Sequence, residues 1–307
     1  FLLLYNNIDN ITKGKNTMNK VCVVTGGGSG IGKAVAQMLP KDCTVIITGR
    51  NEEKLQKTAD ELNKEGCHIV VRACDVSKRS DVTSLAEYAK SLGEVKIVVN
   101  AAGISGSMGS SEKIYRINAL GTVYVNQEFY KVMDKGSVIC DVASNSAYML
   151  PSFLTPKEKK YLLAITDEEA FIKAMVKKAH LTKKEEINAS VAYLISKNFA
   201  RWYSSKCAFK YMYNKGIRVF SVSPGFVKTP MTVKEDSPVS QHLLKYSGTQ
   251  RGAEPEELGY VIASLCDERA GYLMGVDLLV DGGCITSGYS FLKARKLDEC
   301  PSPEGNW

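Results

Sequence analysis

Short runs of apolar, β-branched residues alternate along the chain with longer segments in which apolar positions recur at helical spacing. Most of the short runs are apolar without interruption, as expected of parallel strands buried on both faces. They read VCVVTG, CTVIITG, CHIVVRACDV, VKIVVNAAG, GSVICDVAS, IRVFSVSPG and VDLLVDGG. Helical periodicity fills the segments between them, for example at 34–39, 54–65 and 82–92. The alternation predicts an α/β fold, a doubly wound parallel sheet of about seven strands with helices on both faces.

One segment interrupts this alternation. Residues 151–188 contain no strand pattern and are rich in lysine and acidic residues. Phe171, Met175 and Ala179 recur at i, i+4 and i+8, which predicts a helix with one apolar face. We therefore expect a helical insertion in the domain. A surface helix, a subunit contact and a wall of a substrate site are the roles open to it.

Domain limits follow from the same pattern. Residues 18–290 are expected to form one domain, with Met18 as the native start. Residues 1–17 are interpreted as an irregular or non-native leader, and 291–307 as a C-terminal tail. The long polar stretch 226–250 is typical of a lid over a substrate, and an ordinary surface loop is the alternative.

Composition narrows the class of protein. The 307 residues are 44% hydrophobic and 24% charged, as in ordinary soluble domains. The net charge is +7, but the lysines are spread without a basic run, which argues against a nucleic-acid partner. No run approaches the roughly 20 apolar residues of a membrane span, so no membrane partner is expected.

Cysteines and histidines do not suggest a metal site. The nine cysteines form no CxxC pair, and His68, His180 and His242 lie far apart. Several cysteines sit inside apolar runs, where a free thiol behaves as a small core residue. This pattern favours a reducing compartment, and we expect a cytoplasmic protein.

A glycine cluster follows the first predicted strand and precedes the first helix, in VCVVTGGGSGIGKAV. Gly26, Gly30 and Gly32 would allow a tight turn, close backbone approach and close helix packing. The free amides of the helix N-terminus would then face a pyrophosphate. A flexible turn without a ligand is the alternative, but the position at the first strand–helix junction favours a Rossmann dinucleotide site.

The end of the second strand bears on the choice of dinucleotide. Proteins specific for NAD usually carry an acid here that binds the ribose hydroxyls, whereas this chain has Gly49 and Arg50. A guanidinium suits a 2′-phosphate. We expect NADP(H) to be preferred and NAD(H) to be possible. An arginine that only caps the strand in solvent is the alternative.

Further motifs follow in a fixed order. They are TGxxxGIG at 25–32, Asp75-Val76, Asn100-Ala101-Ala102-Gly103, Asn118 within YRINALG, Pro224-Gly225 and GVDLLVDGG at 275–283. With them the chain resembles the short-chain dehydrogenase/reductase family over about residues 19–283.

The resemblance implies a cofactor site. In it Asp75 would bond the adenine amino group, Asn100 would shape the adenine pocket and Thr229 would hold the nicotinamide carboxamide. Asp75 and Asn100 could instead cap strand ends. The full implied set is Gly26, Ser29, Gly30, Ile31, Gly32, Arg50, Asp75, Val76, Asn100, Ala101, Gly103, Tyr193, Lys197, Pro224, Gly225, Val227 and Thr229.

Two tyrosine–lysine pairs compete for the chemistry, Tyr193 with Lys197 and Tyr203 with Lys206. Offsets of four and three both keep two side chains on one face of a helix. A helix from Lys197 to residue 215 descends about 27 Å, enough to span the sheet, whereas one from Lys206 descends only about 14 Å. Only Lys197 therefore reaches the carboxyl edge of the strands, and the YxxxK motif of the family matches the same pair.

The aromatic residues farther along that helix have a simpler interpretation. Phe199, Trp202, Tyr203 and Phe209 are expected to be core or a subunit interface.

The expected chemistry is proton transfer. A tyrosine titrates near pH 10, and a lysine ammonium one turn away stabilises its phenolate. Tyr193 would donate a proton to a ketone oxygen or accept one from an alcohol. Ser144 would hold the substrate oxygen, with Ser146 as a close competitor. By the resemblance, Asn118 holds a water next to Lys197; an asparagine that only kinks a helix is the alternative.

The predicted function is an oxidoreductase that transfers a hydride between NADP(H) and a secondary alcohol or ketone. An insertion ahead of the tyrosine also occurs in proteins resembling bacterial 3α-hydroxysteroid dehydrogenase/carbonyl reductase, which suggests a hydroxysteroid or another bulky carbonyl. Alternatives are small ketones, 3-oxoacyl substrates, or a non-catalytic dinucleotide sensor. The spacing of the tyrosine and lysine argues against an enoyl reductase. The spacing of the glycines argues against a sugar epimerase. A homodimer or homotetramer is expected, although the insertion puts the usual subunit packing in doubt.

Overall fold

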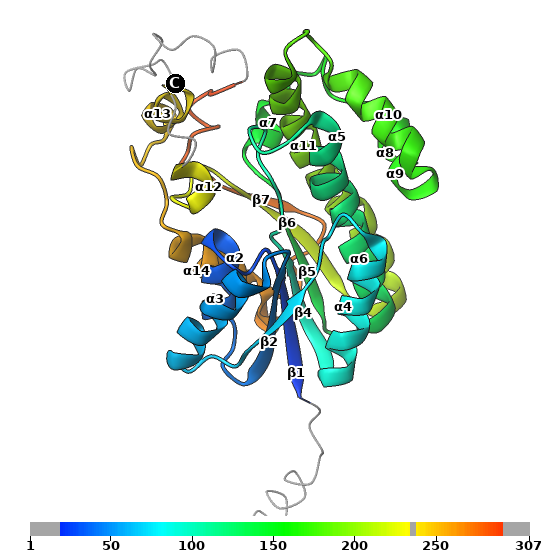
Figure 1. Ribbon diagram of the computed structural model, residues 1–307, viewed down its shortest axis with the longest axis vertical. Coiled ribbons are helices and arrows are strands. Elements are labelled where there is room, and N and C mark those ends of the chain that lie inside the picture. Colours follow the sequence, from blue (N-terminus) through cyan, green and yellow to red (C-terminus); the bar gives the residue numbers. More distant parts are fainter. Residues whose placement is uncertain (1–18, 234–237, 291–307) are drawn as a thin grey trace, which may run out of the picture.

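The central sheet contains seven strands in the order β3-β2-β1-β4-β5-β6-β7, and every neighbouring pair is parallel (Figure 1). The computed structural model describes residues 19–233 and 238–290. The strands are β1 (Lys20–Thr25), β2 (Cys43–Gly49), β3 (Ile69–Ala73), β4 (Glu94–Asn100), β5 (Val138–Val142), β6 (Arg218–Pro224) and β7 (Asp277–Val280). The strand order reverses between β1 and β4, where a crevice for ligands forms in such sheets. The predicted doubly wound α/β fold is confirmed.

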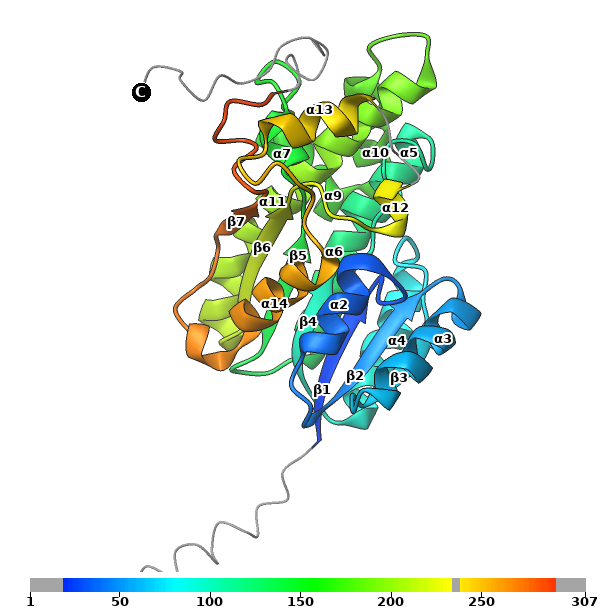
Figure 2. The ribbon, with the colours of Figure 1, turned by 90° about the vertical axis from the view of Figure 1, so that its left-hand side faces the viewer.

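Helices cover both faces of this sheet, because successive strand residues point to opposite sides. In β1, Cys22 and Val24 pack toward α2 (Gly30–Met38), α3 (Glu52–Lys64) and α14 (Pro255–Cys266). Val21 and Val23 pack into the other cluster, with α4 (Arg79–Leu92), α6 (Gly121–Val132) and α11 (Glu185–Lys215). Figure 2 shows α2 and α14 side by side in front of the strands.

Helix α11 is the longest element, with 31 residues, and it carries both competing tyrosine–lysine pairs. It ends at Gly216, whose φ of 67° is left-handed and suits glycine. The amide of Gly216 donates to the Met212 carbonyl, and the chain then rises through β6. The predicted descent, turn and return are present. Tyr193 and Lys197 therefore lie near the carboxyl edge of β5 and β6.

The segment between β5 and α11 is helical and contributes to the main core. It contains α7 (Ser146–Met149), α8 (Glu158–Tyr161), α9 (Leu163–Thr166) and α10 (Glu168–Ala179). Phe171, Met175 and Ala179 on α10 are buried, as the periodicity predicts. The Phe171 ring lies 5.1 Å from that of Phe199 on α11. The insertion is therefore attached to α11 by an aromatic core.

The aromatic positions on α11 divide between core and surface. Phe199 and Tyr203 are buried and Trp202 is half-buried, whereas Phe209 is 72% exposed and lies outside the core. The remaining elements are α5 (Ser111–Ile114), a π-helical segment (Tyr115–Leu120), α12 (Pro230–Val233), α13 (Pro238–Tyr246) and a 3₁₀ turn (Glu268–Ala270). Within the described ranges, no helix is long and apolar enough to cross a membrane.

Replacing Phe171 by alanine should lower the free energy of unfolding by about 3–5 kcal/mol, because the ring is fully buried between Tyr115 and Phe199. The matched control is Phe153→Ala in the same insertion, where the ring is 66% exposed and the loss should stay below about 0.5 kcal/mol. Urea unfolding followed by circular dichroism measures both. Equal losses would contradict a core role for α10.

Candidate active site

The turn between β1 and α2 has the shape of a pyrophosphate cradle. Gly26 and Gly30 have φ of 69° and 54°, a conformation that glycine adopts without strain. A Cβ on Gly32 would lie 2.4 Å from the Gly26 carbonyl oxygen, so the turn closes only over glycine. Ser29 makes no side-chain cap on α2, which leaves the first amides of the helix to a ligand. These features fit a dinucleotide phosphate.

This turn lines a pocket of about 660 Å³. Its described lining residues are Gly26, Ser29, Gly30, Ile31, Gly32, Lys54, Ala101, Ala102, Gly103, Ser107, Met108, Thr229, Pro230 and Met231. Lys54 of α3 is a residue that sequence reasoning missed: its Nζ donates to Ser29 Oγ at 2.8 Å. The sequence does place Lys54 four residues after Arg50, near the start of the helix that follows the second strand, and this position could have indicated its role.

Four predicted cofactor residues, Arg50, Asp75, Val76 and Asn100, are not among those lining this pocket or the one described next. Arg50 is exposed beyond β2. Asp75 Oδ1 accepts hydrogen bonds from the amide and hydroxyl of Ser77, so this oxygen already closes a turn. Val76 is buried.

Asn100 lies inside the protein. Its Oδ1 accepts from Thr25 Oγ1 at 2.8 Å, and its Nδ2 donates to Asp141 Oδ1 at 3.1 Å. These bonds join β1, β4 and β5 below the reversal of strand order. The side chain therefore holds the floor of the crevice together.

A second pocket, of about 120 Å³, adjoins the first at the carboxyl edge of β5 and β6. Ser144, Tyr193 and Lys197 all line it. The other lining residues are Ile31, Ala101, Gly103, Ile104, Val142, Ala143, Pro224, Gly225, Val227, Thr229, Met231 and Thr232. The amide of Ser146 donates to Ser144 Oγ at 3.2 Å, while Ser146 itself is absent from the lining. Of the two serines, only Ser144 is among the described residues that line the pocket with Tyr193.

Lys197 is almost completely buried at the base of this pocket. Its Nζ donates to the Val142 carbonyl at 2.9 Å and lies 6.0 Å from the centre of the Tyr193 ring. Burial lowers the pKa of Lys197 to about 8, and the attraction of Asp141 opposes that fall. The side chain is thus an ammonium at neutral pH, one helical turn from the tyrosine.

Asn118 lies in the π-helical segment Tyr115–Leu120, and π-bulges of this kind are frequent at functional sites. Its Oδ1 accepts from the Ile104 amide and its Nδ2 donates to the Ile104 carbonyl, both at 2.9 Å. The Nδ2 also lies 3.2 Å from Ser196 Oγ on α11. A Cβ on Gly103 would lie 3.3 Å from Asn118 Oδ1 and 3.5 Å from Lys197 Nζ. Both side chains therefore converge on the space at Gly103.

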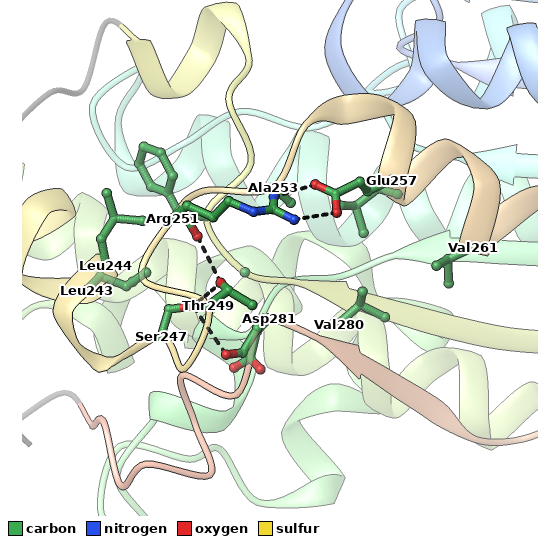
Figure 3. Close-up of a pocket in the computed structure, with 14 residues that line it drawn as sticks. Leu243, Leu244, Ser247, Thr249, Arg251, Ala253, Glu257, Val261, Val280 and Asp281 are labelled. Carbon is green, nitrogen blue, oxygen red and sulfur yellow. Dashed lines mark hydrogen bonds and ion pairs between the residues drawn. The ribbon is translucent and has the colours of Figure 1, made fainter. Parts of the chain in front are cut away.

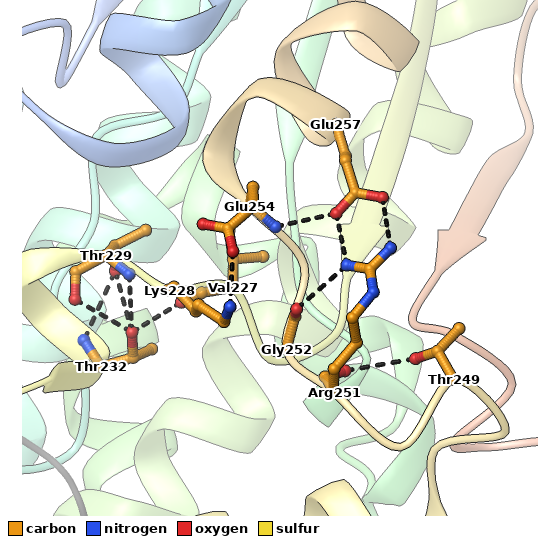
Figure 4. Close-up of polar contacts among 9 residues, drawn as sticks. All are labelled: Val227, Lys228, Thr229, Thr232, Thr249, Arg251, Gly252, Glu254 and Glu257. Carbon is orange, nitrogen blue, oxygen red and sulfur yellow. Dashed lines mark hydrogen bonds and ion pairs between the residues drawn. The ribbon is translucent and has the colours of Figure 1, made fainter.

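The segment after β6 closes the other side of the site. Thr229 lines both pockets, and its amide donates to Thr232 Oγ1 at 2.8 Å. Farther along, Arg251 bonds both carboxylate oxygens of Glu257, at 2.6 and 2.8 Å (Figure 4). This ion pair attaches the end of the segment to α14, which carries Glu257. Part of the predicted lid, 234–237, lies outside the described residues.

A third pocket, of about 240 Å³, opens behind this segment. Figure 3 shows Leu243 and Leu244 of α13 on one side of it and Val261 and Val280 on the other. Among the described residues that line this pocket, Gly225 is the only one predicted as a site residue. Ser144, Tyr193 and Lys197 line the second pocket instead. The described residues also contain no group of histidine, cysteine and acidic side chains that would hold a metal ion.

Comparison with known proteins agrees with this geometry. A family model described as short chain dehydrogenase matches residues 20–155, and one described as Enoyl-(Acyl carrier protein) reductase matches 174–285. The mouse 3-oxoacyl-[acyl-carrier-protein] reductase is 33% identical over 87% of this chain and 98% of its own length. The 3beta-hydroxysteroid dehydrogenase 2 of Eggerthella lenta is 28% identical over 86% and 94%.

Solved structures share the fold. A 7 alpha-hydroxysteroid dehydrogenase complexed with NADH and 7-oxo glycochenodeoxycholic acid superposes with a TM-score of 0.67, at 23% identity over 87% of this chain and 95% of that one. The chain belongs to the short-chain dehydrogenase/reductase family. It is an NAD(P)-dependent oxidoreductase that acts on alcohol or carbonyl substrates.

Gly32→Ala should weaken NADPH binding at least about tenfold, because the new Cβ would push the Gly26 carbonyl out of the cradle. Gly28→Ala is the matched control, since its Cβ would meet only flexible side chains, those of Leu55 at 3.3 Å and Lys54 at 3.7 Å. Titration calorimetry measures both dissociation constants, with thermal unfolding as the check on folding. Undiminished binding in Gly32→Ala would exclude this turn as the phosphate site.

Proposed function

We propose that Tyr193 exchanges a proton with the substrate oxygen while Ser144 holds that oxygen and Lys197 supplies the positive charge. One observation carries this proposal: the three residues, from the turn after β5 and from α11, line a single pocket. That pocket shares Ile31, Ala101, Gly103, Thr229 and Met231 with the pocket of the glycine turn. A dinucleotide with its phosphates at the turn would have its other end beside Tyr193.

The protein side chains supply the proton when a ketone is reduced and accept it when an alcohol is oxidised. NAD(P)H, when bound, supplies the hydride. In reduction the Tyr193 hydroxyl gives its proton to the carbonyl oxygen, and the phenolate left behind lies one turn from the Lys197 ammonium. Lowering a tyrosine pKa by about three units requires about 4 kcal/mol, an amount within reach of a buried charge at this range. Ser144 Oγ, oriented by the Ser146 amide, donates to the same oxygen.

Asn118 is proposed to hold the water that connects Lys197 to solvent. Support comes from the space at Gly103, on which Asn118 Oδ1 and Lys197 Nζ converge. The bonds of Asn118 to both backbone groups of Ile104 fix the loop on one side of that space. The same hydrogen bonds of Asn118 therefore serve both the local fold and the proposed water site.

NADP(H) is the proposed cofactor. Arg50 follows β2 directly, and Lys54 lies one turn farther on in α3, within the pocket of the glycine turn. Two cations at this corner favour a 2′-phosphate over a bare ribose. No carboxylate follows β2 at the position that would bind the ribose hydroxyls. Preference for NADP(H) thus rests on the charge of one corner of the site.

The proposed substrate class is a hydroxysteroid or a similarly bulky carbonyl. Relatives with hydroxysteroid dehydrogenase activity support it, as does the insertion beside the site; the two family models leave 156–173 unmatched between them. A substrate of this size requires a pocket of roughly 300 Å³ or more. The pocket at Tyr193 holds about 120 Å³, so the described part of the predicted lid that lines it, at 227–232, would have to move aside.

The small pocket supports a second candidate, the reduction of small ketones or 3-oxoacyl substrates. Such a substrate would present its carbonyl to Ser144 and Tyr193 without displacement of α12. Homodimer or homotetramer assembly and a cytoplasmic location stay predictions; α10 covers a face of α11 that would otherwise be free for a partner.

Tyr193→Phe should reduce turnover of every substrate by about 100-fold or more, because the proton donor is lost while the ring remains. The assay follows NADPH absorbance with ketosteroids carrying the carbonyl at different ring positions, small ketones and a 3-oxoacyl thioester. Tyr203→Phe is the matched control, and its activity should be close to wild type. Equal activity of Tyr193→Phe and wild type would refute the role. Tight NADPH binding without turnover of any substrate would favour a sensor.

Arg50→Ala should raise the KM for NADPH by about tenfold or more and leave that for NADH nearly unchanged, because only NADPH carries the 2′-phosphate. Lys57→Ala, on the same helix but seven residues beyond Arg50 and away from the end of β2, is the control and should change neither value. Equal effects on the two cofactors would mean that Arg50 does not read the phosphate.

A further inference from the structure

A buried carboxylate adjoins the backbone carbonyl that holds the proposed catalytic lysine. Asp141 is in β5, one residue before Val142, whose carbonyl accepts the hydrogen bond from Lys197 Nζ. Only 1% of Asp141 is exposed, and it does not line the pocket of Tyr193. Its position on the protein side of Lys197 means that it cannot touch a substrate. Asp141 can therefore affect the reaction only through the residues around it.

The carboxylate is surrounded by hydrogen-bond donors. Asn100 Nδ2 donates to Oδ1 at 3.1 Å, and Ser204 Oγ donates to Oδ2 at 2.6 Å. Asn126 Nδ2 donates to both oxygens, at 2.9 and 3.0 Å. The donors come from β4, α6 and α11. An ionised carboxylate only accepts hydrogen bonds, whereas an amide in its place would turn an N–H toward Asn126. The site is therefore built for an anion.

Burying an unpaired carboxylate is costly, so a partner charge is expected nearby. Burial raises the pKa of Asp141 to about 6, and the three donors and the charge of Lys197 oppose the rise. Burial acts on Lys197 in the opposite sense, and Asp141 is the charge that restores part of its pKa. At neutral pH each of the two charges offsets the desolvation of the other.

We propose that Asp141 is a positioning residue for Lys197: its fixed carboxylate keeps the lysine protonated at the base of the pocket, and its bond to Ser204 ties α11 to β5. The proposal rests on the role of Lys197 in the proposed function. It assigns the maintenance of the ammonium to a residue outside the pocket. The ammonium can then face Tyr193 without a carboxylate at the reacting atoms.

Other titratable groups near Asp141 are neutral or already paired. On α11, Tyr203, Cys207 and Tyr211 have pKa values raised by burial, so all three stay uncharged at working pH. β4 and α6 present the amides Asn100 and Asn126. On the β6 side, Ser221 faces Asp277 of β7, whose carboxylate also accepts from Tyr148. Glu128 of α6 is paired with Arg79 and Lys131.

Asp141→Asn tests the proposal through the pH dependence of kcat/KM for alcohol oxidation, in which Tyr193 acts as a phenolate and the basic limb reports loss of the Lys197 proton. Removing the negative charge lowers the pKa of Lys197, so the ammonium is lost at a lower pH. The basic limb of the profile should move to lower pH by about 0.5–1 unit. Ser204→Ala is the matched control: it breaks a bond in the same cluster but keeps the charge, so its basic limb should coincide with that of wild type.

A direct measurement separates this inference from the proposed function. The Lys197 side-chain carbon resonance, assigned with Lys197→Arg, is titrated in the protein without cofactor, and its pKa should fall by the same amount in Asp141→Asn. If Asp141→Asn does not fold, Asp141→Ser removes the same charge with a smaller side chain. Unchanged titration and an unchanged basic limb would overturn the role of Asp141. Full activity in Lys197→Met would instead refute the proposed function.

Discussion

In the proposed mechanism the Lys197 ammonium must stay charged inside the protein, and the surroundings of Lys197 fit that requirement. A buried amine tends to lose its proton, which would leave the tyrosine without a counter-charge. The Val142 carbonyl, at 2.9 Å, and the Asp141 carboxylate behind it both favour the protonated form. Asp141 and Val142 both belong to β5. The packing of α11 against β5 therefore decides whether Lys197 can stay protonated beside Tyr193.

That position depends on contacts far from the pocket. Ser204, two turns below Lys197, bonds Asp141, and Asn118 reaches α11 at Ser196 while it holds the loop after β4. The insertion adds an aromatic contact between α10 and α11 through Phe171 and Phe199. Helix α11 is thus held from the sheet, from the π-helical segment and from the insertion, and the spacing of Tyr193 and Lys197 alone would not place them.

The two pockets are joined in a similar way. Thr25, Asn100 and Asp141 form a chain of hydrogen bonds across β1, β4 and β5, directly below the reversal of strand order. The glycine turn follows Thr25 at one end of this chain, and Val142, whose carbonyl accepts from Lys197, follows Asp141 at the other. Thr229, packed beside Gly30, closes the opposite wall and lines both pockets. One polar network therefore sets the distance between the phosphate end and the reacting end.

The sequence by itself determined the sheet, the glycine turn and the placement of Tyr193 and Lys197 near the carboxyl edge of the strands. These depend on local periodicity and on lengths along the chain, which a one-dimensional pattern contains. The predicted helices 54–65 and 82–92 begin two and three residues late, because the Asn51 cap and the first turn of α4 carry no apolar signal. The tertiary structure alone decided that Asn100 lies inside the sheet, that Lys54 enters the phosphate pocket and that Asp141 stands behind Lys197. Those three depend on which strands and helices become neighbours, and residues 25 or more positions apart leave no local trace of that.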